Sequence, residues 1–507
     1  MHSHATVPPL GTPLTLEQLH FSNSFARLSA EFHARVRPTP LRNPHLISFN
    51  PAAAALIDLD CTEAARADFP DIFNGGKPLP GCEPLAMHYA GHQFGQYVSQ
   101  LGDGRAIMLG EVLTRHGARW ELQLKGAGQT PFSRAGDGRA VLRSTIREYL
   151  CSEAMHGLGI PTTRALCILG SDEEVYRESI ETGAVLVRMA PSHVRFGSFE
   201  AFYYGNRVEA LRSLADYVIE HHYPDLIGRP DRYLALFREV VQRTARLLAD
   251  WQLVGFAHGV MNTDNMSILG LTLDYGPFGF LDDYEPGFIC NHSDHQGRYA
   301  FDRQPEIALW NLSCLGQALL PLFDARPEAA AEQAMAQFDL YTTTFEARYR
   351  RGLGDKLGLR ETRPGDLQLA QRLLEQMAME RRDYTLTWRH LADFDSAPDA
   401  DPTPLRDRFI DRAAFDAWAC DYAARLHAEQ SDDRARRAAM QRVNPKFVLR
   451  NYLAHNAIER AREQHDYTEI ERLLRVLQRP FAEHPDDADL AEPPPDWGRR
   501  LQVSCSS

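Results

Sequence analysis

The feature that most constrains this chain is a pair of polar signatures that directly follow one long amphipathic helix. Apolar residues recur every three or four positions along 233–252, which predicts a helix with one buried face. The predicted helix leads into the loop His258-Gly-Val-Met-Asn-Thr-Asp-Asn265, and Asp274-Tyr-Gly276 follows nine residues after that loop. An amide and a carboxylate brought together in this way are suitable ligands for Mg²⁺ or Mn²⁺.

The two signatures share the spacing of the catalytic loop and the metal-binding triplet of protein kinases. Kinases write the loop as H-R-D-x-x-x-x-N and the triplet as D-F-G. Here His258 and Asn265 keep the separation of seven residues, but Val260 occupies the position of the base Asp. Because an apolar side chain cannot accept a proton, the chain either binds nucleotide without chemistry or uses a different base. Asp264 is the nearest carboxylate for that role.

We predict that Asn265 and Asp274 are the metal ligands, with residues 266–273 forming a short strand hairpin between them. The alternative is that 262–265 is an ordinary surface turn, because Asn, Thr and Asp are common turn formers. The register of His258 with the preceding helix favours the metal site.

A lysine and a glutamate are predicted to form an ion pair near the phosphates. Lys125 ends an alternating segment, 120–125, that is typical of a strand, and Glu148 lies in a predicted helix over 139–156. In kinases such a pair steadies the lysine that binds phosphate. The alternative for either residue alone is a solvated surface side chain.

Two glycine-rich segments are predicted to contact phosphate. The pentapeptide Gly-Asp-Gly-Arg-Ala occurs at 102–106 and again at 136–140, and its glycines expose backbone amides. The first copy lies between two predicted strands, 97–101 and 106–113, so it also reads as a hairpin turn.

Arg188 and Arg195 are further phosphate candidates. They flank the segment Ala190-Pro-Ser-His193, and an arginine can donate two hydrogen bonds to one phosphate. Most arginines in an acidic protein instead pair with surface carboxylates, so each is weak evidence by itself.

Composition limits the partners and the compartment. A chain of 507 residues is too long for one small hydrophobic core, which favours a two-lobed unit with extensions. The net charge of −13 argues against nucleic acid or an anionic membrane as the main partner. No run of about 20 apolar residues is present, so we expect no membrane span. No secretory signal is visible at the N-terminus, and the eight scattered cysteines favour a reducing compartment, which predicts a cytoplasmic protein.

Two cysteines suggest a redox gate, that is, a disulfide that regulates the protein. Cys505 is third from the end on a predicted flexible tail, and Cys290 follows Asp274 by sixteen residues, where kinases place their activation segment. A disulfide between Cys290 and Cys505 is the hypothesis; two unremarkable thiols are the alternative.

Several stretches resemble the selenoprotein O family of protein adenylyltransferases, called pseudokinases because their catalytic-loop Asp is missing. The resemblance covers roughly residues 20–320 and the tail Cys505-Ser-Ser507, where some members carry selenocysteine at the third-last position. The matching stretches are Met87-His-Tyr-Ala-Gly-His-Gln-Phe-Gly95, Gln123-Leu-Lys-Gly-Ala-Gly-Gln-Thr-Pro-Phe-Ser-Arg134, Gly136-Asp-Gly138, His258-Gly-Val-Met-Asn-Thr-Asp-Asn-Met266 and Asp274-Tyr-Gly-Pro-Phe-Gly279.

The resemblance implies that ATP binds flipped, with its α-phosphate facing the acceptor. AMP is then transferred to Ser, Thr or Tyr hydroxyls of proteins and pyrophosphate leaves, with UTP and Mn²⁺ as an alternative pair. Family members are tied to oxidative-stress responses and protein glutathionylation. The residues that would hold the nucleotide are Gly102, Gly104, Arg105, Lys125, Asp137, Gly138, Arg188, Arg195 and Asp274.

The resemblance also assigns the remaining roles. Glu148 would pair with Lys125, Asn265 and Asp274 would bind Mg²⁺ or Mn²⁺, and Asp264 would act as the base. The expected fold is α+β, kinase-like and bilobal, with an N-terminal extension and a large C-terminal helical region. Its parts are an extension over 1–80, a β-rich nucleotide-binding part with one long helix over 81–200, a catalytic part over 201–320, a helical region over 321–481 and a flexible tail over 482–507 with Cys505.

Two other functions compete with protein adenylyltransfer. One is a conventional kinase for proteins or small molecules, against which Val260 argues. The other is a non-catalytic nucleotide-binding redox module, against which the complete set of Lys125, Glu148, Asn265 and Asp274 argues.

Overall fold

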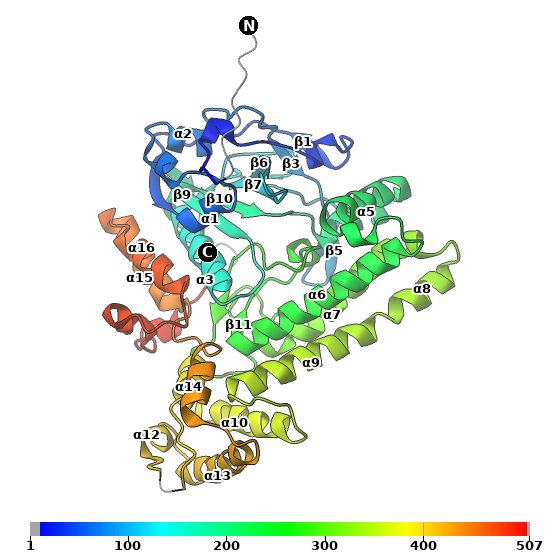
Figure 1. Cartoon of the computed structure of the whole chain (residues 1–507). Helices are drawn as coiled ribbons and strands as arrows, with labels where there is room; N and C mark the ends of the chain where they lie inside the picture. Colours follow the sequence, from blue (N-terminus) through cyan, green and yellow to red (C-terminus); the bar gives the residue numbers. More distant parts are fainter. Residues whose placement is uncertain (1–10, 399, 504–507) are drawn as a thin grey trace.

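The chain folds into a sheet-rich part and a larger helical part that meet along one side. The computed structural model describes residues 11–398 and 400–503. The sheet lies at the top of Figure 1 in blue and cyan, and the helices from α5 onward extend below it. The structure is therefore α+β, as predicted, with antiparallel strands and many helices.

The sheet has eight strands in the order β1-β3-β6-β7-β10-β9-β2, and β8 pairs with β10. All of its pairings are antiparallel. The strands are β1 (His33–Arg35), β2 (His45–Phe49), β3 (Leu85–Met87), β6 (Ala106–Leu113), β7 (Arg119–Lys125), β8 (Ala140–Val141), β9 (Arg164–Tyr176) and β10 (Ile180–Ala190).

Both faces of the sheet are covered. On β7 the predicted alternation is present, and Leu122 and Leu124 pack in a core with the N-terminal segments. The opposite face, which carries Glu121 and Gln123, is also fully buried. Buried polar side chains must find partners, so this second face carries a hydrogen-bonded network instead of meeting solvent.

One long helix supports that second face. Helix α3 (Leu142–Gly157) packs against β9 and β10, and its Ile146 and Leu150 share a core with Leu186 of β10. On its other side α3 contacts α15 (Asn451–Gln464) and α16 (Thr468–Leu477) from near the C-terminus.

The amphipathic helix predicted over 233–252 is α6 (Arg232–Val254). It ends at Gly255, whose φ of 70° is the left-handed conformation that favours glycine as a helix terminator. The next strand, β11 (Phe256–Ala257), pairs with β12 (Gly279–Phe280). Residues 258–278 therefore form a loop whose two ends are held together.

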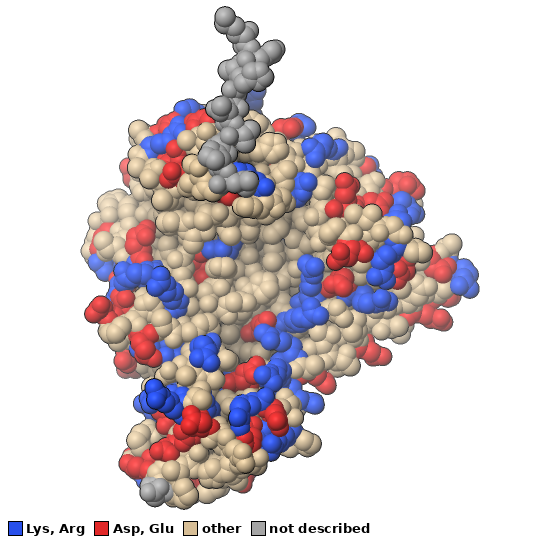
Figure 2. Space-filling view, viewed as in Figure 1, with Lys and Arg blue, Asp and Glu red and all other residues tan. Residues whose placement is uncertain are grey.

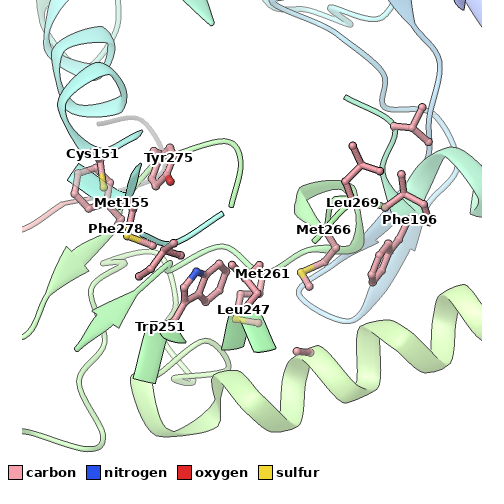
Figure 3. Packing of buried hydrophobic residues seen from close by; sticks show 14 of the residues in the cluster. Cys151, Met155, Phe196, Leu247, Trp251, Met261, Met266, Leu269, Tyr275 and Phe278 are labelled. Atoms are coloured by element: carbon pink, nitrogen blue, oxygen red, sulfur yellow. The ribbon is translucent and has the colours of Figure 1, made fainter. Parts of the chain in front are cut away.

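Apolar side chains of α3 and α6 hold this loop in place. Cys151 and Met155 of α3 lie close to Phe278, and Trp251 of α6 lies beside Met261 (Figure 3). The loop thus rests on α3 and α6 together.

Most of the remaining helices lie in the helical part, whereas α1 packs against β9 and α2 against β2. Figure 1 places α6, α7 and α9 side by side, with α10, α12, α13 and α14 below them and α15 and α16 next to α3. The bounds are α1 (Pro51–Ala55), α2 (Phe69–Phe73), α4 (Phe196–Tyr204), α5 (Val208–His222), α7 (Gln304–Phe323), α8 (Pro327–Met335), α9 (Phe338–Lys356), α10 (Asp366–Glu380), α11 (Tyr384–Leu391), α12 (Thr403–Arg406), α13 (Arg412–Ala428) and α14 (Asp433–Gln441).

One helical stretch, Phe301–Phe323, is long and apolar enough to cross a membrane by length and composition. More than half of it is buried inside the protein, and its helix α7 packs against α4 and α6. A core helix passes the same test, and the packing of α7 is that of a core helix.

Three local predictions were wrong. Residues 102–104 do not join paired strands, because β5 (Gln96–Val98) pairs with β4 (Gly91–Gln93) and not with β6. Residues 266–273 form no hairpin, since Ser267 and Thr272 make isolated bridges to Arg195 and Thr162.

The third wrong prediction is the flexible tail, because residues 482–503 pack against the body. Arg472 donates to Asp487 at 2.8 Å, and the amide of His292 donates to the carbonyl of Val503 at 2.8 Å. Two short 3₁₀ helices, Pro485–Ala491 and Gly498–Arg500, lie in this segment. Cys505 lies outside the described residues.

The contact between α3 and α16 predicts a position-specific effect of one methyl group. A Cβ at Gly157 would lie 2.1 Å from the carbonyl oxygen of Leu477. We expect Gly157→Ala to lower the free energy of unfolding by about 1–3 kcal/mol through overpacking, measured by urea denaturation.

Gly354 in α9 provides the matched control, because a Cβ there meets nothing within 4 Å. Gly354→Ala should leave stability unchanged or raise it by up to about 1 kcal/mol through helix propensity. Equal effects of the two substitutions would contradict a tight α3–α16 contact.

Candidate active site

A cavity of about 810 Å³ lies between the sheet and the loop that follows α6. Three predicted residues, Glu148, Arg195 and Cys290, are not among those that line it. The predicted residues that do line it are Gly102, Gly104, Arg105, Lys125, Asp137, Gly138, Arg188, Asp264, Asn265 and Asp274. Segments far apart in the sequence therefore meet at one place.

Asp274 is the centre of the site because three cations contact its carboxylate. Lys125 Nζ lies 3.2 Å from one oxygen, and Arg195 Nη1 donates to the other at 2.5 Å. Arg188 Nη1 also donates to Asp274. Burial alone would raise the pKa of Asp274, but Arg188, Arg195 and Lys125 together hold it well below its usual range.

Sheet register explains why two of these cations converge. Arg188 of β10 lies opposite Gln123 of β7, and Lys125 is two residues further along the same face of β7. Arg188 Nε donates to Gln123 Oε1 at 2.6 Å, which fixes the guanidinium against the sheet.

Glu148 of α3 completes the charge cluster from behind. It accepts from Lys125 Nζ at 2.5 Å and from Arg188 Nη1 at 3.1 Å. The predicted contact between Lys125 and Glu148 is thus formed. Asp103 lies 3.9 Å from Arg195, so the three cations, Lys125, Arg188 and Arg195, face three carboxylates. The other two carboxylates are Asp274 and Glu148. The cluster therefore concentrates cations beside the cavity without a surplus of positive charge.

Arg195 still has hydrogen-bonding capacity. Its Nη1 donates to the backbone carbonyl of Asp264 at 2.8 Å, and its guanidinium lies 4.5 Å from the centre of the Tyr89 ring. Its Nε and Nη2 are buried and lack hydrogen-bond partners among the residues the structure describes. Buried unsatisfied donors are rare and mark a place for acceptor oxygens of a ligand.

Asp103, between Gly102 and Gly104, was missed by the sequence reasoning. It accepts from the amide of Met87 and from Gln123 Nε2, each at 3.0 Å, so it anchors the glycine segment to two strands. Its counterpart in the second copy, Asp137, instead pairs with Arg177 near the surface. The repeated pentapeptide was the available signal, but it could not tell which copy would be buried.

His258 stabilises the conformation of residues 258–265, called here the catalytic-type loop because they keep the spacing of a kinase catalytic loop. Its Nε2 donates to the carbonyl of Leu273 at 3.0 Å, and its Nδ1 accepts from the amide of Val260 at 3.3 Å. The ring stacks on Trp251 at 5.4 Å, and burial lowers the pKa of His258, so the ring is a neutral structural link.

The predicted metal ligands fit a hard divalent cation. Asn265 Nδ2 donates to the carbonyl of Val260 at 3.1 Å, which reserves its Oδ1 for another partner. Asp274 has a φ of 60°, a left-handed conformation that is uncommon outside glycine and is held here by its ion pairs. An amide oxygen and a carboxylate in one cavity suit Mg²⁺ or Mn²⁺.

Asp264 has the environment expected of a base. It is 8% exposed, its Oδ1 has no hydrogen-bond partner among the described residues, and burial raises its pKa to about 7. Close packing fixes its position, since a Cβ at Gly91 would lie 2.8 Å from Asp264 Oδ1.

Cys290 packs against the loop at Gly259 and lies outside the cavity. It is buried, and its Sγ donates to the carbonyl of Ala257 at 3.5 Å. The pairing with Cys505 stays a prediction, because Cys505 is not among the described residues.

A cavity with clustered cations, a candidate base and two hard oxygen ligands has the features of an enzyme that acts on a nucleoside triphosphate. Charged side chains of both signs are interspersed over the face shown in Figure 2. The overall charge of −13 therefore does not prevent three cations from gathering at one site.

Comparison with known proteins gives the same class over nearly the whole chain. A family model described as "Protein adenylyltransferase SelO" matches residues 15–478. The protein nucleotidyltransferase YdiU of Myxococcus xanthus (strain DK1622) is 61% identical over 493 residues, which cover 97% of this chain and 100% of that protein.

Two further relatives carry the same name. That of Thioalkalivibrio sulfidiphilus is 61% identical over 495 residues, covering 97% of this chain and 99% of the relative. That of Thiobacillus denitrificans is 57% identical over 495 residues, covering 97% and 100%. The chain belongs to the protein adenylyltransferase SelO family, which confirms the resemblance drawn from its motifs.

The charge cluster predicts that Asp274 stabilises the protein before any ligand binds. Asp274→Asn leaves the three cations with Glu148 and the more distant Asp103 as their carboxylate partners in the cluster. We therefore expect the free energy of unfolding to fall by about 3 kcal/mol in nucleotide-free protein. Urea denaturation followed by circular dichroism measures this.

Asp231→Asn is the matched control, because Asp231 pairs with Arg229 on the surface. It should leave stability unchanged, since exposed ion pairs contribute little. If Asp274→Asn were no more destabilising than this control, Asp274 would not be what holds the cations together.

Proposed function

We propose that this chain transfers AMP from ATP to Ser, Thr or Tyr hydroxyls of protein substrates and releases pyrophosphate. The observation that carries the proposal is the cluster of Lys125, Arg188 and Arg195 around Asp274, whose carboxylate lines the same cavity as Asp264. Membership of the protein adenylyltransferase family supports it.

In the proposed reaction the substrate hydroxyl oxygen attacks the α-phosphorus of ATP. A new oxygen–phosphorus bond forms, the bond from the α-phosphorus to the bridging oxygen of the β-phosphate breaks, and Asp264 receives the hydroxyl proton. Lys125, Arg188 and Arg195 stabilise the negative charge that develops on the departing pyrophosphate, which is where fixed cations contribute most.

Asn265 and Asp274 would hold Mg²⁺ or Mn²⁺, which would neutralise phosphate charge when bound. For Asp274 to do so, ATP phosphates must take over its contacts with the three cations. The backbone amides of Gly102, Gly104 and Gly138, together with Arg105 and Asp137 at the rim, would complete the nucleotide site.

The proposal extends to architecture and setting. The sheet-rich part and the helices that follow it would correspond to the two lobes of a kinase-like fold, divided near 81–200 and 201–320, with helical residues 321–481 added. A cytoplasmic location and a redox role for Cys290 and Cys505 belong to the same proposal. UTP with Mn²⁺ is the alternative nucleotide and metal.

The residues of the site argue against the two alternatives to AMP transfer, a conventional kinase and a non-catalytic module. A kinase would need a base at position 260, where Val260 cannot accept a proton. A non-catalytic module would have no need of Asp264, whose raised pKa and unpartnered oxygen suit proton transfer.

The deciding experiment uses ATP labelled on either the α- or the γ-phosphate, with the full chain, Mg²⁺ or Mn²⁺, and a mixture of acceptor proteins. We expect acceptors to gain the α-label only, because AMP retains the α-phosphate. Retention of the γ-label would establish a kinase, and no label from either nucleotide would favour the non-catalytic alternative.

The role of Asp264 is tested separately. Asp264→Asn should lower the rate of AMP transfer by about 10²–10⁴-fold, the usual range for loss of a general base. ATP should still raise the thermal midpoint of this variant, because the cation cluster is intact. An unchanged rate would remove Asp264 from the mechanism.

Gly91→Ala provides a second variant, since its Cβ would displace Asp264 without altering its chemistry. We expect it to slow AMP transfer as well. Gly287→Ala, where a Cβ meets nothing within 4 Å, should not.

A further inference from the structure

A second polar cluster lies behind the catalytic-type loop. His92 of β4, Glu200 of α4 and Cys314 of α7 bring an imidazole nitrogen, a carboxylate oxygen and a sulfur within 4.8 Å of one another. His92 Nδ1 and Glu200 Oε1 are 2.7 Å apart. None of these three residues lines the cavity described above.

The packing of α4 creates this cluster from three distant parts of the chain. Helix α4 contacts β4, α7 and the 3₁₀ helix Thr263–Asn265. The rings of Tyr97, Tyr204 and Trp310 surround His92 at 5.3, 5.9 and 5.3 Å between centroids. The site is thus enclosed largely by aromatic groups.

Glu200 is poorly compensated for a buried acid. It is fully buried, and among the described residues its ion-pair partner is His92, an imidazole that carries a charge only when protonated. Its second oxygen accepts from the neutral hydroxyl of Thr263 at 2.5 Å. An ionised carboxylate in the interior needs a cation, and Arg or Lys does not supply one here.

We propose that His92, Glu200 and Cys314 bind one divalent transition-metal ion, with Zn²⁺ favoured by the donor set. Imidazole nitrogen, carboxylate oxygen and thiolate sulfur are the ligand types of zinc, whereas Mg²⁺ takes oxygen ligands. The site therefore differs in chemistry from that of Asn265 and Asp274, and it does not depend on the proposed reaction.

The required rearrangement is small. Zinc–ligand bonds of about 2.0–2.3 Å at tetrahedral angles place ligand atoms about 3.3–3.5 Å apart. The His92–Glu200 pair must open from 2.7 Å, and the widest separation must close from at most 4.8 Å. Each change is on the order of an ångström, within the reach of side-chain rotation.

Metal binding releases one proton. Burial raises the pKa of the Cys314 thiol to about 12, so the thiol is protonated before the ion binds. As the metal–sulfur bond forms, the sulfur loses its proton to solvent, and the hydrogen bond between His92 and Glu200 is replaced by two bonds to the ion.

The proposed metal site contacts Thr263, the residue directly before the candidate base Asp264. Thr263 donates to Glu200 and accepts from the amide of His92 at 2.7 Å, and Asp264 follows it directly in the chain. An ion that fixes His92 and Glu200 therefore also fixes the start of the 3₁₀ helix that carries Asp264 and Asn265. We assign the site a positioning role for this loop.

Cobalt substitution tests the site without reference to catalysis. Metal-free, reduced full-length protein is titrated with Co²⁺, which gives a thiolate-to-cobalt charge-transfer band when a cysteine coordinates it. We expect a band that saturates at one Co²⁺ per chain, is removed by Zn²⁺ and persists in excess Mg²⁺. Cys314→Ser should abolish the band, and Cys420→Ser, which alters an exposed thiol, should retain it.

A wild-type protein without the band, or Cys314→Ser protein that keeps it, would overturn the proposal. Because Cys314→Ser alters a core helix, X-ray absorption at the zinc edge of the wild-type protein provides an independent measurement. One sulfur together with nitrogen or oxygen neighbours is expected. No sulfur, or two or more, would also overturn it.

Discussion

The contacts of Asp274 hold the site of this protein together. A single carboxylate joins Lys125 of β7, Arg188 of β10 and Arg195 ahead of α4, and Glu148 of α3 supports two of these cations. Each charge would be costly to bury alone, because ionised groups lose their hydration inside a protein. The sheet, the long helix and the loop after α6 must therefore dock in one arrangement.

The same cluster explains how an acidic protein can bind a polyanion. The net charge of −13 is spread over the surface, whereas three cations, Lys125, Arg188 and Arg195, gather around Asp274 at the cavity. Charges in a partly buried site are screened less than exposed ones. Local placement therefore outweighs the overall balance, and Nε and Nη2 of Arg195 have no hydrogen-bond partner among the described residues.

Some features could not be predicted because they depend on long-range packing. An Asp-Gly pair between apolar runs usually marks a hairpin, but Asp103 turns inward to bind Met87 and Gln123, so β6 pairs elsewhere. The acidic segment after 482 has the composition of a linker, yet the arginines of α16 bind its carboxylates. His92, Glu200 and Cys314 are 108 and 114 residues apart in turn, and no local spacing relates them.

The sequence by itself indicated the class of the protein and most residues of the candidate site. The spacing of His258, Asn265 and Asp274, the alternation ending at Lys125 and the periodicity of α6 are local patterns, and local patterns survive in the sequence. Only the tertiary structure decided which charges meet, which Asp is buried and which donors stay unpaired. Those outcomes depend on the register of β7 and β10 and on the docking of α3 and α4, which are set by contacts between residues far apart in the chain.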